Sequence, residues 1–335
     1  MEIVFIHLNT RVPRYLYWNL KTHINRFPEH SVRLIHSNHI KPPKIKGLYT
    51  SFAIEDPRWG ELNQLYNHPK EFRANFWLTS SVRLFALENH MSKLKREMIH
   101  VESDVILAPD FPFDSFTRLD EKLAFPLISN ERGVASIVYL RNLEAARILT
   151  STLLSEASID KLTTEMLSLR KVYERNRKKV HVLPIGGSTQ DFRNIDSKSK
   201  ENITKSCLYF GGIFDGVEIG QFFFGTDPRN RRGKKLLRTD LVNGYVNVVN
   251  LFLRYEPNRR FINVVSKASN TSIKLYTVHI PSKETELFRT RSQSKVLEKG
   301  CDDSKLGPRS KVLVRPLFLA IVQSILRRVS KVKQK

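Results

Sequence analysis

Over the first 110 residues, short apolar runs alternate with longer amphipathic stretches. The apolar runs EIVFIHLN, SVRLIHSN and MIHVESDVIL have the length and composition of strands. Residues 14–27 and about 76–96 carry apolar side chains at helical spacing. Strands that alternate with helices predict an α/β fold, with a mostly parallel twisted sheet and helices on both faces. In such sheets, ligands bind at the carboxyl ends of the strands.

The remainder of the chain contains further apolar runs and a basic end. KLAFPLIS, GVASIVYLRN and HVLPIGG read as strands, a helix is expected from Leu143 to about Arg175, and two or three strands are expected late in the chain (GYVNVVNLFLRYE, RRFINVV, SIKLYTVHI). Residues 284–310 resemble a linker. Residues 311–335 can form an amphipathic basic helix, with Pro316 in its first turn. Such a helix would lie on an anionic membrane surface or pack on its own domain.

The net charge of the chain limits the classes of partner that are expected to bind it. With 56 Lys and Arg against 33 Asp and Glu, the formal net charge is +23. Such a field attracts nucleic acid, anionic lipid or phosphorylated substrates. Two cysteines cannot make a disulfide framework or a zinc site, which favours a reducing compartment. The first residues read as a strand rather than a signal peptide, and no apolar run reaches the roughly 20 residues of a membrane-spanning helix.

In this basic chain, Glu102 and Asp104 stand one residue apart in or at the end of an apolar strand. Side chains at positions i and i+2 of a strand point to the same face. Two carboxylates on one face repel each other unless a cation lies between them or one keeps its proton. A divalent metal that also binds a diphosphate would remove the repulsion. The alternative is an ordinary solvated strand end.

The ESD triplet resembles the DxD element of GT-A glycosyltransferases, which use nucleotide-sugars and a divalent metal. This resemblance implies Mn²⁺ or Mg²⁺ as cofactor. Asp104 matches the metal-binding acid of that family, and the resemblance implies that Glu102, in place of Asp, reaches the metal or the donor ribose. Arg83 stands in a preceding helix where the family often places an arginine that binds the nucleotide-sugar. The alternative for Arg83 is a solvated surface residue.

Two later segments resemble glycosyltransferases of the bacterial surface-polysaccharide type. FDGVEIGQFFFGTDPRN, residues 214–230, is similar to a DGAAIGQY-x-x-G-x-DPRN pattern. Its acids Asp215, Glu218 and Asp227 are the candidates for the catalytic base, and a buried turn with structural acids is the alternative. LYTVHIPSK, residues 275–283, resembles an LHIHSK segment, which implies that His279 is a third metal ligand and that Lys283 binds the diphosphate.

Further positions of the chain either match the family pattern or differ from it. The first strand ends at His7 and Asn9, where the family seats the nucleotide base. Glu165 stands where the family often has Asp, so a catalytic role for it is not expected. Glu102, Glu165 and Thr277 all differ from the family pattern, and an inactive member is therefore also possible on sequence grounds.

The resemblance covers residues 1–283 in scattered blocks and implies a GT-A-like catalytic domain. Its nucleotide-binding half would span about 1–110 and its acceptor-side half 111–283. The expected activity is hexosyl transfer from a nucleotide-diphospho-sugar, with a UDP-sugar first among donors, to a glycan or lipid-linked acceptor in surface polysaccharide synthesis. The expected location is the cytoplasm, peripheral on the cytoplasmic face of a membrane.

Two other functions compete with glycosyl transfer. A non-catalytic polyanion-binding protein, most plausibly for nucleic acid, would fit the charge. However, the basic residues are dispersed, no nucleic-acid motif is present, and the acid pair would disfavour a phosphate groove, so nucleic acid is not the expected partner. A nucleotidyltransferase would share the metal-binding carboxylates and a related α/β sheet, but would release pyrophosphate.

Overall fold

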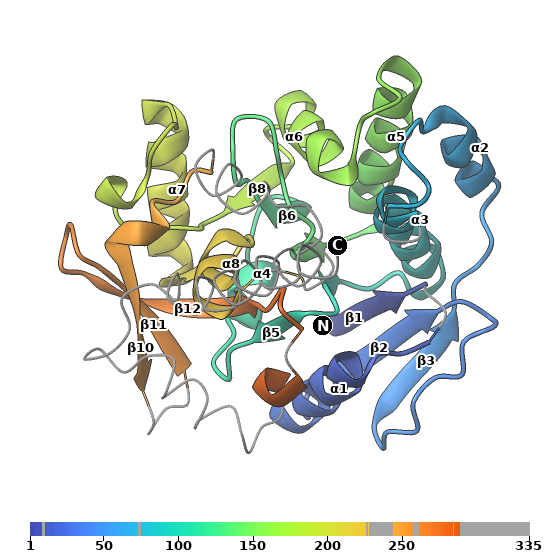
Figure 1. Ribbon diagram of the computed structural model, residues 1–335, viewed down its shortest axis with the longest axis horizontal. Helices are drawn as coiled ribbons and strands as arrows, with labels where there is room; N and C mark the ends of the chain where they lie inside the picture. Colours follow the sequence, from blue (N-terminus) through green and yellow to red (C-terminus); the bar gives the residue numbers. More distant parts are fainter. Residues whose placement is uncertain are drawn as a thin grey trace, which may run out of the picture.

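The computed structural model describes residues 1–8, 11–72, 75–225, 227, 244–256, 261–283 and 285–288 (Figure 1). Within these ranges the chain folds into two sheets flanked by helices. The strands are β1 (Glu2–His7), β2 (Ser31–His36), β3 (Leu48–Phe52), β4 (Met98–Val101), β5 (Val105–Leu107), β6 (Leu123–Pro126), β7 (Ile137–Leu140), β8 (Val180–Leu183), β9 (Gly212–Phe214), β10 (Leu251–Glu256), β11 (Phe261–Ser266) and β12 (Ser272–His279).

Eight α-helices are described in the same ranges. They are α1 (Arg14–Arg26), α2 (Pro57–Leu65), α3 (Phe76–Leu94), α4 (Phe113–Thr117), α5 (Leu143–Ile159), α6 (Glu165–Arg175), α7 (Ser197–Phe210) and α8 (Glu218–Phe224). Short 3-10 helices cover Thr189–Asp191, Val248–Asn250 and Thr285–Phe288. None of the described helices is both long enough and apolar enough to cross a bilayer.

The larger sheet has the strand order β3-β2-β1-β4-β7-β6-β8. β7 is antiparallel to both of its neighbours, and the other pairs are parallel. The smaller sheet has the order β10-β11-β12-β5, and β9 also pairs with β12. The predicted α/β fold with a mostly parallel sheet is therefore confirmed.

The central strand β1 is buried on both faces because its side chains alternate between two cores. Val4 and Ile6 belong to a core that includes residues of α3 and α5. Ile3 and Phe5 belong to a second core that includes residues of α1. In Figure 1, α3 and α5 lie on one side of the sheet and α1 on the other. A strand covered on both faces reads as a continuous apolar run, as the sequence EIVFIH does.

The predicted strand MIHVESDVIL is wrong as a single strand. β4 ends at Val101, a turn covers Glu102 to Asp104, and β5 pairs with β12 of the other sheet. Asn19 of α1 holds this crossing, because its side-chain amide donates to the carbonyls of Ser103 at 3.0 Å and Val105 at 2.8 Å. The two acids therefore project from a turn between two sheets rather than from one face of a strand.

Other boundaries also differ from the sequence prediction. The helix expected from Leu143 to Arg175 is two helices, α5 and α6, with the Thr164 side chain capping α6 by accepting the Leu167 N–H. GYVNVVNLFLRYE becomes a strand only from Leu251, after a 3-10 turn. Helix α7 and strand β3 were not predicted.

The predicted basic helix at 311–335 lies outside the described residues, as does the linker-like segment 284–310 except for 285–288. The expected division of the domain near residue 110 stays a prediction.

Helix α8 and the end of β12 approach each other at Gly220. A Cβ built on Gly220 would lie 1.7 Å from the backbone oxygen of His279. No side chain fits there without backbone movement. Gly60, in contrast, lies in α2 with nothing within 4 Å of a built Cβ.

We therefore expect Gly220→Ala to lower the free energy of unfolding by about 3 kcal/mol or more, because overpacking against backbone cannot relax easily. The matched variant Gly60→Ala should raise that free energy by up to about 1 kcal/mol, since Ala is favoured over Gly inside a helix. Urea unfolding followed by circular dichroism measures both. Equal stabilities for the two variants would contradict the close approach.

Candidate functional site

A cavity of about 730 Å³ opens at the carboxyl ends of β1 and β4, beside the end of β12. Ligands bind at this edge in open α/β sheets. The cavity is lined by both polar and apolar side chains. They are Ile6, His7, Leu8, Arg11, Pro13, Tyr15, Phe76, Thr79, Ser80, Arg83, Glu102, Ser103, Asp104, Gln221, Asp227, His279, Pro281 and Lys283.

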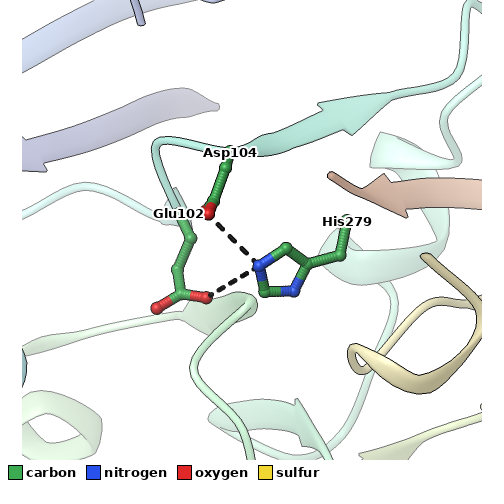
Figure 2. A group of neighbouring side chains, drawn as sticks. All are labelled: Glu102, Asp104 and His279. Atoms are coloured by element: carbon green, nitrogen blue, oxygen red, sulfur yellow. Dashed lines mark ion pairs between the residues drawn. The ribbon is translucent and has the colours of Figure 1, made fainter. Parts of the chain in front are cut away.

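Glu102, Asp104 and His279 meet at this cavity (Figure 2). One ligand atom from each residue lies within 4.8 Å of the other two. Nε2 of His279 is 3.4 Å from Oδ1 of Asp104 and 3.8 Å from Oε2 of Glu102. The backbone fixes this approach, because the Ile280 N–H donates to the carbonyl of Asp104 at 2.8 Å. The turn after β4 and the end of β12 are thereby held together.

Positive charge beside Glu102 and Asp104 offsets the repulsion between these two acids. Burial alone would lower the pKa of His279, but Asp104 and Glu102 outweigh it and raise the pKa to about 9. Burial would also raise the pKa of Asp104, but His279 and Lys283 hold that pKa below its ordinary value. The raised pKa favours a protonated imidazole, which places a positive charge beside both carboxylates. A cation at this position offsets the repulsion between the acids.

The residues fit a divalent metal by the chemistry of their donor atoms. Two carboxylate oxygens and one imidazole nitrogen suit Mn²⁺, and carboxylates with substrate oxygens suit Mg²⁺. Nε2 of His279 already faces both acids, so a metal there would take the place of the proton. Asp104 and His279 are both buried, and Glu102 is half-buried.

Two basic side chains contact the acids of the cluster, Lys283 at Asp104 and Arg83 at Glu102. Nζ of Lys283 lies 3.3 Å from Oδ2 of Asp104 and 2.7 Å from Oδ2 of Asp227. A guanidinium nitrogen of Arg83 lies 2.8 Å from Oε1 of Glu102, and another lies 3.8 Å from Oε1 of Glu165. Lys283 and Arg83 can therefore attract the negative charge of a ligand that binds beside the cluster.

Glu165 holds Arg83 in place rather than facing the cavity. It begins α6, is buried, and accepts a hydrogen bond from the Ser80 hydroxyl at 2.8 Å. Burial is the main reason that its pKa is raised, and Arg83 opposes that rise. The extra methylene of Glu relative to Asp keeps the carboxylate within reach of α3. Nothing in the sequence around Glu165 indicates that this residue positions Arg83.

The structure separates the three acids predicted as candidates for the base. Asp227 lines the cavity beside Lys283. Asp215 lies beneath the site, where its carboxylate accepts N–H groups of Ile219, Gly220 and His279 at 3.2, 2.7 and 2.9 Å. Its own N–H donates to the hydroxyl of Thr277 at 2.8 Å, which accounts for Thr at that position.

Glu218 is buried and does not line the cavity. One carboxylate oxygen accepts the Val246 N–H at 3.3 Å, and the other is buried with no hydrogen-bond partner among the described residues. Neither Glu218 nor Asp215 lines the cavity, although Asp215 accepts a hydrogen bond from the backbone N–H of His279. Asp227 lines the cavity and shares Lys283 with Asp104.

The predicted base-binding residues are only partly described. His7 lines the cavity, and its Nε2 donates to the carbonyl of Arg11 at 2.7 Å. Asn9 lies outside the described residues. Tyr15 was not predicted, yet it lines the cavity and its hydroxyl lies 3.3 Å from that of Ser103. Tyr15 lies in an amphipathic helix, and no motif around it indicates that it lines a binding site.

No protein-family model matches the chain, and no curated protein matches its sequence. Among solved structures, the galactosyltransferase LgtC in complex with donor and acceptor sugar analogs is similar to it, with 12% identity and a TM-score of 0.42 over 62% of this chain and 84% of that one. An active-site mutant of LgtC matches with 12% identity and a TM-score of 0.43 over 61% of this chain and 83% of that one.

Mouse xyloside xylosyltransferase 1 in its apo form is also similar, at 11% identity and a TM-score of 0.36 over 55% of this chain and 86% of that one. All three solved structures are of glycosyltransferases.

The burial of Glu218 predicts a measurable pH dependence of stability. Burial raises its pKa from the ordinary 4.5 to about 8. Between these values the folded chain keeps a proton that the unfolded chain releases, so stability falls as pH rises. We expect Glu218→Gln, which cannot ionise, to gain about 1 kcal/mol per pH unit relative to wild type from pH 5 to 8. Urea unfolding at several pH values measures this.

The exposed variant Glu131→Gln is the control, and its stability should follow that of the wild type across the same range. A Glu218→Gln curve parallel to the wild-type curve would mean that Glu218 is ionised in the folded protein.

Proposed function

We propose that the chain is a metal-dependent glycosyltransferase that moves a sugar from a nucleotide-diphospho-sugar to a glycan or lipid-linked acceptor. The observation that carries this proposal is the cluster of Glu102, Asp104 and His279 on the wall of a cavity of about 730 Å³. That volume is within the range of small-molecule sites, about 300–1,000 Å³. Lys283 and Arg83 beside the acids support a phosphorylated ligand rather than a neutral one.

Glu102, Asp104 and His279 would hold Mn²⁺ or Mg²⁺. When bound, such a cation neutralises a diphosphate and makes it a better leaving group. Lys283 donates to the phosphate oxygens from the side of Asp104, because its ammonium already lies 3.3 Å from that carboxylate. Arg83 keeps Glu102 oriented toward His279 through its 2.8 Å ion pair.

His7 and Tyr15 occupy the part of the cavity near the end of β1 and the start of α1, which supports a place there for the nucleoside. Among the three acids, Asp227 is our candidate for the base that takes a proton from the acceptor, since it alone lines the cavity. Lys283 lies between Asp227 and Asp104, and it would separate the acceptor side from the metal side.

The finer assignment is also a proposal. The donor is a UDP-sugar, the transferred group is a hexose, and the product belongs to surface polysaccharide synthesis. The formal charge of +23 supports work at the cytoplasmic face of an anionic membrane, with residues 311–335 as the contact.

Nucleotide binding tests the proposal directly. Calorimetry should show that UDP, or another nucleoside diphosphate, binds the wild type only with Mn²⁺. We expect Asp104→Asn to weaken this binding by more than about 100-fold, beyond the cost of losing a partner that only orients a ligand. The control Asp110→Asn changes an exposed acid that pairs with Lys274, and it should bind like the wild type. Metal-dependent binding that survives in Asp104→Asn would refute the site.

Lys283→Met separates the phosphate contact from the metal contact. Loss of a charged hydrogen-bond donor should weaken nucleoside diphosphate binding about tenfold or more. Binding of Mn²⁺ alone should stay equal or become tighter, because a positive charge beside Asp104 is removed. Titration of each variant with Mn²⁺ alone, and then with nucleotide, measures the two effects. Lys274→Met, in β12 and outside the cavity, is the matched control. An equal loss of nucleotide binding in both variants would contradict the role of Lys283.

A further inference from the structure

A second cavity, of about 450 Å³, lies at the edge of the larger sheet. β8 forms this edge, and α7 packs against it (Figure 1). The cavity shares no lining residue with the first one. Its lining comes from four separate parts of the chain: Glu121, Tyr173, Arg177, Val180, His181, Val182, Asn202, Lys205, Ser206 and Tyr209.

Three of these side chains form a hydrogen-bonded line. Nε2 of His181 lies 2.8 Å from the hydroxyl oxygen of Ser206, and Nδ1 lies 3.3 Å from Oε2 of Glu121. A carboxylate can only accept, so Nδ1 carries the proton and donates to Glu121. In the neutral ring, Nε2 then accepts from the Ser206 hydroxyl. The order serine, histidine, acid is the one that activates a serine nucleophile.

The imidazole of His181 is held by its surroundings. The rings of Tyr209 and Phe210 have their centroids 5.9 and 5.6 Å from it. The Tyr209 hydroxyl is itself fixed, because it donates to the Ser115 carbonyl at 2.9 Å. The hydrogen bond from His181 lowers the pKa of Glu121, which keeps that acid charged. Ser206 is buried in α7 but reaches the cavity wall.

We propose that Glu121, His181 and Ser206 form a second catalytic site, which hydrolyses carboxylic esters. The Ser206 oxygen bonds to the acyl carbon while its proton moves to Nε2 of His181. The ester C–O bond then breaks, and the departing alkoxide takes the proton from His181. Water next attacks the acyl carbon of the acyl-serine and loses a proton to Nε2 of His181. The bond between the acyl carbon and the Ser206 oxygen then breaks, and that oxygen takes the proton back from His181, which releases the carboxylic acid and restores Ser206.

The remaining lining defines the class of ester. Asn202 precedes Ser206 by one helical turn and lies on the same face of α7, where its amide supplies an N–H donor for the oxyanion. Arg177 and Lys205 add positive charge to the wall, although the ammonium of Lys205 also contacts Glu201 at 2.7 Å. A small ester that carries an anionic group is the substrate that these side chains would select.

A fluorophosphonate probe on the full chain tests this site, since it reacts with activated serines by forming an O–P bond and releasing fluoride. Mass spectrometry of the digested protein should locate the adduct on Ser206 of the wild type, and Ser206→Ala should carry none there. His181→Gln should react about 100-fold more slowly, the contribution of a general base. Ser197→Ala, at the exposed start of the same helix, should label at the wild-type rate.

No adduct on Ser206 of the wild type would overturn the proposal, as would His181→Gln labelling as fast as the wild type. Circular dichroism checks that each variant is folded. If Ser206→Ala or His181→Gln does not fold, Glu121→Gln decides: slower labelling of Ser206 supports the site, and an unchanged rate refutes it. The esterase proposal does not depend on the glycosyltransferase function.

Discussion

Two carboxylates lie within ion-pair distance of one imidazole at the candidate site, and the arrangement depends on compensating positive charge. Glu102 and Asp104 both approach Nε2 of His279, at 3.8 and 3.4 Å. Arg83 pairs with the first acid and Lys283 with the second. Without these cations, desolvation and mutual repulsion would protonate one acid or push the side chains apart. The surrounding elements of the fold fix the positions of these charged side chains.

Elements of both sheets fix the positions of Glu102 and Asp104. The chain leaves the larger sheet at Val101 and joins the smaller one at Val105, so the acids project from the crossing. Asn19 fixes the crossing from one side through two carbonyls. From beneath, Asp215 accepts backbone N–H groups of both α8 and His279, and Gly220 allows the two elements to come that close. Asp215, one of the three predicted candidates for the base, makes these contacts through both of its carboxylate oxygens.

The charge distribution combines an acidic centre with a basic rim inside a strongly basic chain. A metal ion bound to a diphosphate has that same pattern in reverse, positive at the centre and negative outside. Asp227 extends the acidic part on the far side of Lys283. In the proposed function, this complementarity, more than the net charge of +23, favours a phosphorylated small molecule over a long polyanion, which the acids would repel.

Alternation of apolar and amphipathic segments is a local property, so the fold class could be predicted from the sequence. The resemblance of two segments to GT-A glycosyltransferase motifs implied Glu102, Asp104 and His279 as metal ligands, and the structure brings these side chains together. The packing of the two sheets, which the sequence did not reveal, places the acids at a turn between sheets and Glu165 beside Arg83. Only the tertiary structure aligned Ser206 with His181 and Glu121. Side chains from separate elements meet only when sheets and helices pack, and periodicity along the chain carries no information on that packing.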